Sequence, residues 1–178
     1  IDLLAEINRV KPVSIELGLQ TIHESTARYI RRGYETAVYY DAVKRLKDAG
    51  IEVVTHIILG LPGEDHAELM QQANTIATLP LDMIKLHQLQ LIRGTRMARE
   101  YAEHPEEFHL YTVDEYIDLA IDYIERLPET MVVERFISQS PRSLLIAPDW
   151  GMKNYQFVDR LRRCMQERGT WQGRLYTP

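Results

Sequence analysis

Apolar and polar positions alternate in long blocks along the chain. Runs rich in Ile, Val and Leu occupy residues 13–19, 51–59 and 83–92, and a weaker run follows at 131–138. Apolar runs of this length are typical of strands that are buried on both faces of a parallel sheet. We therefore predict four strands, of which the one at 131–138 has the weakest pattern.

Amphipathic stretches between these runs predict helices. Three pairs have the spacing of a capping box, with a Thr or Asp three residues before a Glu: Thr21 with Glu24, Asp65 with Glu68, and Thr112 with Glu115. Two more helices are predicted from about Thr36 to Gly50 and over residues 153–168. Alternation of strands with helices predicts parallel βα units.

The number of these units limits the architecture. Three or four βα units within 178 residues predict an α/β fold that is either part of an incomplete barrel or a small open sheet. A closed barrel of eight strands needs about 250 residues and is excluded. Residues 1–150 would contain the units, and residues 151–178 would form a basic C-terminal helix and tail.

Charge is distributed unevenly and narrows the choice of partners. The chain has a net charge of −5 at pH 7. Residues 1–150 hold 24 acidic and 15 basic side chains, whereas residues 151–178 hold two acidic and six basic side chains. An acidic main part repels phosphate, so its charge does not support a nucleic-acid surface. The basic tail could contact an anion, although a solvated basic helix is the commoner case.

Cysteine content and hydropathy indicate the compartment. Cys164 is the single cysteine, so neither a disulfide within the chain nor a metal site with several cysteines is expected, and a buried structural thiol is the commoner role. No apolar run is long enough to span a membrane, and the first residues lack a signal-peptide pattern. We therefore expect a cytoplasmic protein, and no His and acid spacing predicts a metal site.

Polar and small residues gather at the ends of the three clear strands. They are Glu16, Gly18 and Gln20 on the first, His56, Gly60 and Gly63 on the second, and His87, Gln88 and Gln90 on the third. Ligands bind at the carboxyl ends of parallel strands, so these positions are candidates for a binding site. Two interpretations stay open: Glu16 either contacts a polar ligand or forms a salt bridge to an arginine, and the glycines either shape a turn or let a flat ligand approach. For His56 and His87, a hydrogen-bonded core histidine is the commoner role.

Four short motifs together resemble the radical S-adenosylmethionine (SAM) family. GLQ at 18–20, RRGY at 31–34, GLPGE at 60–64 and IRGT at 92–95 follow the order of that family's catalytic barrel. The set is most similar to the branch shared by the oxygen-independent coproporphyrinogen oxidase and the Elongator catalytic subunit. The segment ERFISQSPRSLLIAPDW, at 134–150, is similar to the YhcC-like subgroup.

This resemblance implies a fold and an activity. Residues 1–150 would be the C-terminal half of an incomplete (β/α)6 TIM-like barrel, with strands four to six and a following strand. The intact protein would bind SAM at a [4Fe–4S] cluster and generate a 5′-deoxyadenosyl radical. The family's C-x3-C-x2-C cluster motif is absent from this sequence, so the chain alone is expected to be inactive. Neither a catalytic residue nor a substrate is predicted.

Eight residues match family positions that surround SAM. The resemblance assigns the ribose or methionyl part to Glu16 and Gln20, the SAM carboxylate to Arg32, the adenine side to His56, Ile58 and Gly60, and the adenine edge to Leu91 and Ile92. The geometry of a guanidinium fits a carboxylate well. At His56 the sequence departs from the family, which often has a glycine there.

Two other hypotheses stay open. An ordinary α/β enzyme or phosphate-binding barrel would hold an anion in GLPGED at a helix N-terminus, although Glu64 and Asp65 disfavour an anion at that place. A non-catalytic assembly or binding module would use an exposed strand edge. An incomplete barrel exposes such an edge, so we expect self-association through residues 13–19.

Overall fold

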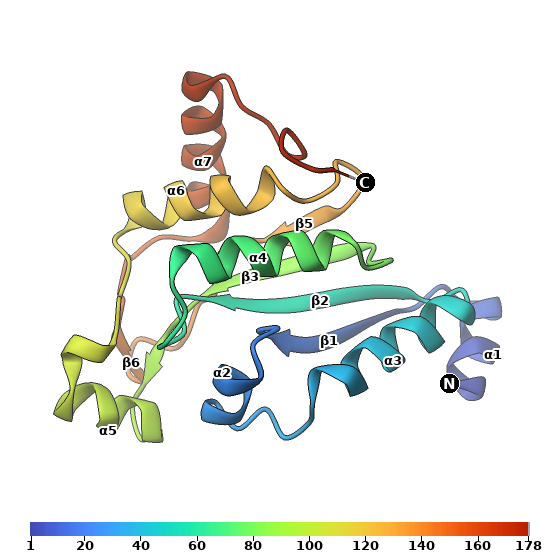
Figure 1. Cartoon of the computed structure of the whole chain (residues 1–178), viewed down its shortest axis with the longest axis horizontal. Coiled ribbons are helices and arrows are strands. Elements are labelled where there is room, and N and C mark those ends of the chain that lie inside the picture. Colours follow the sequence, from blue (N-terminus) through green and yellow to red (C-terminus); the bar gives the residue numbers. More distant parts are fainter. Residues whose placement is uncertain (178) are drawn as a thin grey trace.

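The computed structural model describes residues 1–177, in which helices and strands alternate (Figure 1). The helices are α1 (Asp2–Val10), α2 (Glu24–Tyr29), α3 (Thr36–Asp48), α4 (His66–Ala77), α5 (Arg96–Glu103), α6 (Val113–Ile124) and α7 (Asn154–Arg168), with a short 3-10 helix at Pro105–Glu107. The strands are β1 (Ser14–Gln20), β2 (Glu52–Leu59), β3 (Met83–Gln88), β4 (Leu91–Ile92), β5 (Val132–Arg135) and β6 (Leu145–Ala147). The predicted α/β fold is confirmed.

Four of these strands form one parallel sheet. Their order is β1-β2-β3-β5, and each neighbouring pair is parallel, as the predicted βα units require. The prediction of one continuous strand over 83–92 is wrong, because β3 ends at Gln88 and β4 begins a separate antiparallel pair with β6. The predicted strand over 131–138 is shortened to β5, and β6 was not predicted.

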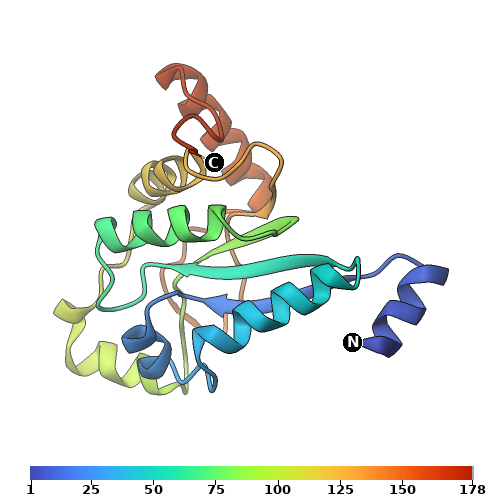
Figure 2. The ribbon, with the colours of Figure 1, turned by 45° about the vertical axis from the view of Figure 1, so that its right-hand side comes forward.

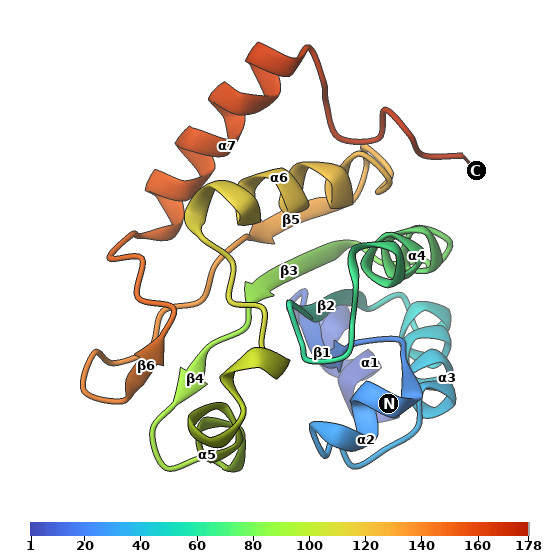
Figure 3. The ribbon, with the colours of Figure 1, turned by 60° about the vertical axis from the view of Figure 1, so that its left-hand side comes forward.

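The hydrophobic core lies between the sheet and the three helices α3, α4 and α6. Figure 3 shows these helices on one side of the sheet, away from β4 and β6. Strand residues that face them, such as Ile57, Leu59 and Ile84, are fully buried, as is Ile76 on α4. Burial of each such side chain contributes about 1.5–3 kcal/mol. The side chains of alternate residues point to the opposite face, which is polar and carries the candidate site.

Two of the three predicted capping boxes are confirmed. Asp65 caps α4 with Glu68, and Thr112 caps α6 with Glu115, each with both reciprocal hydrogen bonds. The box of Thr21 with Glu24 is wrong, because α2 begins after His23. The Thr21 hydroxyl instead donates to the carboxylate of Glu64, and Glu24 accepts from the Thr36 backbone N–H at 2.6 Å.

The basic C-terminal segment packs against the acidic helix α6. Arg160 pairs with Asp114, Arg168 pairs with Asp118, and the Arg174 Nε lies 2.9 Å from a Glu125 oxygen. Much of the positive charge of residues 151–178 is therefore neutralised within the chain. The thiol of Cys164 on α7 is partly buried against the core.

Helix α1 protrudes beyond one end of the sheet, as Figure 2 shows, and is joined to the rest of the chain by Leu4, which packs against the core, and by a hydrogen bond from the Asn8 side chain to the Gly50 carbonyl at 3.1 Å. None of its residues is buried, and Leu3 and Val10 are 68% and 89% exposed. Among the described helices, none combines the length and the apolar composition that crossing a membrane requires.

Candidate functional site

A chain of hydrogen bonds crosses the polar face of the sheet from β1 to the segment after β5. The Glu16 Oε2 lies 2.7 Å from the His56 Nε2, and the His56 Nδ1 lies 3.3 Å from the His87 Nε2. The His87 Nδ1 in turn contacts the Ser138 hydroxyl. The two imidazole rings are stacked, with centroids 5.2 Å apart. Side chains that are far apart in the sequence thus form one connected group.

Charge at the β1 end of this group is balanced by Lys85. Its ammonium lies 2.7 Å from Glu16 and 3.1 Å from Glu134, and its side chain is only 8% exposed. The hydrogen bonds from Lys85 and His56 lower the pKa of Glu16, and the bond to Glu16 raises the pKa of Lys85. Of the two interpretations of Glu16, the salt bridge is present, and its partner is a lysine rather than an arginine.

His87 is held in its neutral form. Burial lowers its pKa to about 4, and the nearby positive charges of Arg135 and Lys85 add to this effect. A neutral imidazole donates from one nitrogen and accepts at the other. His87 can therefore accept from the Ser138 hydroxyl while it donates to His56, so the group needs no net positive charge on the rings.

A polar pocket of about 270 Å³ lies beside these histidines, at the carboxyl ends of β1, β2 and β3. Its lining consists of Gln20, His56, Ile58, His87, Gln88, Leu89, Gln90 and Ser138. Gln20 has a φ of 60°, which is uncommon for a residue other than glycine. Its Oε1 is buried and has no hydrogen-bond partner among residues 1–177. A strained residue with an unpaired acceptor is a candidate for ligand contact.

A largely apolar pocket of about 340 Å³, which Arg31 and Arg96 also line, adjoins the polar one and shares Ile58, Leu89 and Gln90 with it. Ile30, Leu61, Ile92 and Met97 add further apolar surface to this second pocket. A ligand that occupied both pockets would therefore contact a polar lining at one end and a largely apolar lining at the other.

The structure brings together five of the eight predicted residues. Gln20, His56 and Ile58 line the polar pocket, Ile58 and Ile92 line the apolar one, and Glu16 contacts His56.

Gly60, Leu91 and Arg32 do not join this group. Gly60 is buried, and a Cβ on it would lie 3.0 Å from the Tyr111 ring, so Tyr111 occupies the space that a flat ligand was expected to use. Leu91 is fully buried in a small apolar cluster.

Arg32 serves the protein interior instead of a ligand. Its side chain is 2% exposed, and its Nη1 donates to the carbonyl oxygens of Leu19 and Thr21 at 3.1 and 2.9 Å. Its Nη2 donates to the Thr36 hydroxyl at 3.0 Å, and its Nε donates to the Tyr34 carbonyl at 3.0 Å. With its donors used in this way, the expected pairing with a SAM carboxylate does not fit this structure.

Three residues of the site were not predicted from the sequence. Lys85 stands in an apolar run, and Ser138 contacts His87 across 51 positions of the chain. Tyr111 lies over Gly60 from a loop before α6. Only Lys85 carried a signal, since a charge inside a buried strand needs a partner. Among the described residues, no group of three or more His, Cys, Asp or Glu could hold a metal ion.

Comparison with models of known protein families assigns this chain to a superfamily. Residues 1–76 match the model of the radical SAM superfamily, and residues 81–167 match the model of the radical SAM C-terminal domain. The chain belongs to the radical SAM superfamily. The predicted resemblance is confirmed, and the two models meet between α4 and β3.

Individual relatives of this radical SAM chain are similar over its whole length. Protein YtqA of Bacillus subtilis is 36% identical, with 99% of this chain and 54% of YtqA covered. Protein YhcC of Escherichia coli is 31% identical, with 100% of this chain and 57% of YhcC covered. A tRNA uridine(34) acetyltransferase of Methanocaldococcus infernus is 25% identical, with 92% of this chain and 31% of that protein covered. The chain therefore spans about half the length of YtqA and YhcC.

A solved structure shows the same fold. The archaeal Elp3 of Methanocaldococcus infernus, with an N-terminal deletion, superimposes with a TM-score of 0.81 at 20% identity, covering 96% of this chain and 40% of Elp3. The βα arrangement of this chain is thus that of the corresponding part of a radical SAM protein.

Proposed function

We propose that this chain supplies the nucleoside-binding side of a radical SAM enzyme. The polar pocket would hold the ribose and methionyl part of SAM, and the adjoining apolar pocket would hold the adenine. The observation that carries this proposal is Gln20, a residue that lines the polar pocket and whose buried Oε1 has no hydrogen-bond partner among residues 1–177.

The two pockets fit the two halves of the nucleoside chemically. A buried acceptor without a partner costs about 1–3 kcal/mol, and a ribose hydroxyl donating to Gln20 would remove that cost. Glu16, whose side chain is 49% exposed, has room to accept a third donor beside Lys85 and His56. Ile58 and Ile92 offer apolar surface on which an adenine ring can lie.

The iron–sulfur cluster does not fit the residues of this chain. A [4Fe–4S] cluster is held by several cysteine thiolates, and the single Cys164 lies on α7, packed against the main core. Cysteines that bind the cluster would have to come from another part of the intact enzyme. Such a cluster would supply the redox chemistry of the intact enzyme, whereas the residues described here would bind and orient the nucleoside.

The alternative of an anion at the start of α4 is not favoured. The carboxylate of Asp65 already accepts from the Glu68 backbone N–H at 2.9 Å, and the Glu68 carboxylate accepts from the Asp65 backbone N–H at 2.8 Å. The helix N-terminus is therefore capped by the chain itself, and three carboxylates (Glu64, Asp65 and Glu68) lie beside it.

Calorimetric titration of the chain with S-adenosylhomocysteine tests the proposal. This analogue keeps the adenosyl group but needs no cluster chemistry. Gln20→Ala should weaken binding about 10-fold, which corresponds to about 1.4 kcal/mol, the scale of one hydrogen bond. Gln71→Ala is the matched control, because Gln71 is exposed on α4, away from both pockets.

Two results would contradict the proposal. One is absence of binding by the unchanged chain at millimolar analogue. The other is an equal loss of affinity in Gln20→Ala and Gln71→Ala, because only the first residue lines the pocket.

A further inference from the structure

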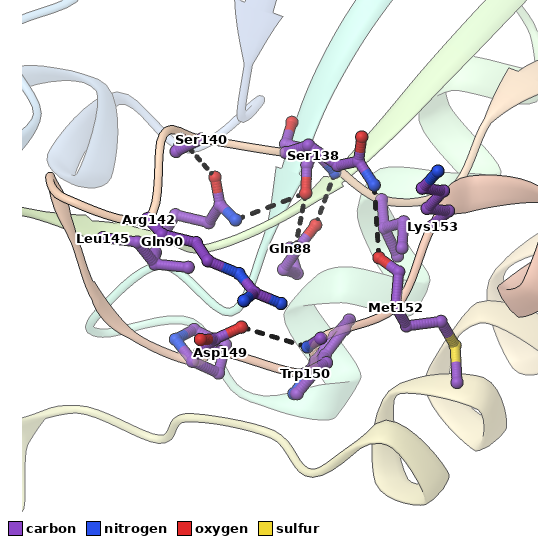
Figure 4. Close-up of a pocket in the computed structure, with 14 residues that line it drawn as sticks. Gln88, Gln90, Ser138, Ser140, Arg142, Leu145, Asp149, Trp150, Met152 and Lys153 are labelled. Atoms are coloured by element: carbon purple, nitrogen blue, oxygen red, sulfur yellow. Dashed lines mark hydrogen bonds between the residues drawn. The ribbon is translucent and has the colours of Figure 1, made fainter.

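A third pocket, of about 240 Å³, is lined in part by Ser138 and adjoins the polar pocket (Figure 4). The segment after β5 and the segment before α7 surround this pocket. Gln88, at the end of β3, and Gln90, just before β4, form the wall next to the sheet. Gln88, Gln90 and Ser138 line both pockets, so the two cavities share a wall.

The walls of this third pocket are fixed by hydrogen bonds. The Gln88 side chain accepts from the Ser138 N–H at 2.7 Å and donates to the Ser138 carbonyl at 3.0 Å. The Gln90 Oε1 accepts from the Ser140 hydroxyl at 2.7 Å. On the opposite wall, the Trp150 indole donates to the Tyr111 carbonyl at 3.1 Å. A site fixed in this way loses little conformational entropy when it binds a ligand.

Two cations of this pocket have no anionic partner among residues 1–177. Figure 4 shows Arg142 reaching into the pocket, with Lys153 on another side of it. Ion pairs occupy four other basic residues of the C-terminal part (Arg160, Arg163, Arg168 and Arg174), but neither Arg142 nor Lys153 pairs with a carboxylate among residues 1–177. Asp149 also lines the pocket, and one of its oxygens accepts from the Gly151 N–H at 3.0 Å. The lining therefore holds two cations against one carboxylate, in a chain whose net charge is −5.

We propose that this pocket binds the substrate, a small molecule with a phosphate or carboxylate group that Arg142 and Lys153 recognise. The inference rests on the proposed function, since a substrate of a SAM-derived radical must lie next to the nucleoside, and this pocket shares a wall with the nucleoside pocket. A guanidinium and an ammonium on different sides of a pocket contact different oxygens of one anion. Arg142 and Lys153 are then specificity-determining residues.

The size and the charge of the protein favour a small molecule over a nucleic acid. A cavity of about 240 Å³ encloses one small group rather than a stretch of backbone. A polyanion would also meet the repulsive field of the acidic main part, whereas a single phosphate or carboxylate meets mainly the two local cations.

Titration of the ¹⁵N-labelled chain with inorganic phosphate, and separately with acetate, followed by amide NMR at constant ionic strength, tests this inference. Saturable shifts should concentrate at residues 138–142 and 149–154. Arg142→Ala combined with Lys153→Ala should weaken the binding of whichever anion binds at least 10-fold. The matched control is Lys11→Ala combined with Arg99→Ala, which removes the same two charges from exposed positions outside the pocket and should leave binding unchanged.

Each outcome bears on the inference separately from the proposed function. Shifts that do not saturate with either anion, shifts spread over many exposed cations, or an equal loss in both double variants would overturn it. A short RNA oligonucleotide that binds this surface more tightly than either anion would also overturn it. If S-adenosylhomocysteine fails to bind while an anion still shifts residues 138–142 and 149–154, the proposed function fails and the anion site stands. If S-adenosylhomocysteine binds but neither anion gives saturable shifts, the anion site is refuted and the proposed function stands.

Discussion

Replacement of Arg32 should destabilise the chain in the absence of any ligand. The guanidinium is enclosed, and its bonds hold the end of β1 and the start of α3 together. If Arg32 were a ligand residue, its loss would leave the unfolding of the free chain unchanged. The substitution therefore separates a structural role from the role that the family resemblance implies.

The magnitude follows from the acceptors that the substitution leaves behind. Arg32→Ala removes a donor from the backbone carbonyls of Leu19 and Thr21 and from the Thr36 hydroxyl. The Leu19 carbonyl keeps the Thr21 N–H as a donor at 2.8 Å, so the Thr21 carbonyl is the backbone acceptor most affected. Each buried acceptor without a partner costs about 1–3 kcal/mol, and removal of one member of a buried charged network costs about 3–5 kcal/mol. We expect a loss of about 3–5 kcal/mol from a total stability of about 5–15 kcal/mol.

Urea unfolding followed by circular dichroism measures this loss. With a slope of about 1–3 kcal/mol per molar urea, the midpoint should fall by roughly 1–5 M. Arg32→Lys should recover only part of it, because an ammonium cannot reach acceptors on several sides. Arg28→Ala is the control, since Arg28 is exposed on α2 and its loss should change stability by less than about 0.5 kcal/mol. An Arg32→Ala midpoint within error of the Arg28→Ala midpoint would refute the structural role.

Three further predictions follow from the site and the sheet. Because the pKa of His87 is about 4 in the folded chain and near 6.5 when unfolded, the unfolded state binds a proton first as pH falls. Stability should therefore decline by about 1–3 kcal/mol between pH 6.5 and 4, and His87→Asn should remove that part of the decline in urea unfolding. Gly60→Ala should cost about 1–3 kcal/mol more than Gly63→Ala in thermal or urea unfolding, because both glycines have positive φ but only the Cβ at Gly60 meets Tyr111. β1 pairs with one neighbour among the described strands, so light scattering should show an apparent mass that rises with concentration.

Each of these predictions has a clear contrary result. A ring titration of His87 near pH 6.5 in NMR would contradict the neutral, buried histidine. Equal costs for the two glycine substitutions would show that Tyr111 yields without strain. A constant monomer mass at high concentration would remove the self-association of β1.

The sequence predicted those features that depend on local pattern. The apolar runs of β1, β2 and β3 identified strands buried by helices, and the caps at Asp65 and Thr112 depend only on a partner three residues away. Interactions of this kind lie within a few positions, so a spacing rule finds them.

The errors arose where a distant contact replaced a local one. Thr21 matches the capping spacing, but its hydroxyl bonds to Glu64, which is 43 positions away. Gln88 and Gln90 interrupt the predicted strand because their amides bind the segment around Ser138, about 50 positions away. Arg32 has the residue type of a carboxylate ligand, yet burial turns its donors inward. Each outcome depends on tertiary packing, which one sequence does not display.

Residues 173–175 bind the C-terminal end of α6. Leu175 donates its N–H to the Glu125 carbonyl at 2.7 Å, Gly173 donates to the Ile124 carbonyl at 3.1 Å, and Arg174 neutralises the carboxylate of Glu125, whose side chain is 7% exposed. A protease that trims the chain after α7 would remove the main countercharge of that carboxylate together with the hydrogen bonds that Thr170 and Leu175 donate to Glu125. Shortened versions of this protein should thus end after Tyr176 rather than after Arg168. An affinity tag at this end should be joined by a spacer long enough to leave the contacts of residues 173–175 with α6 intact.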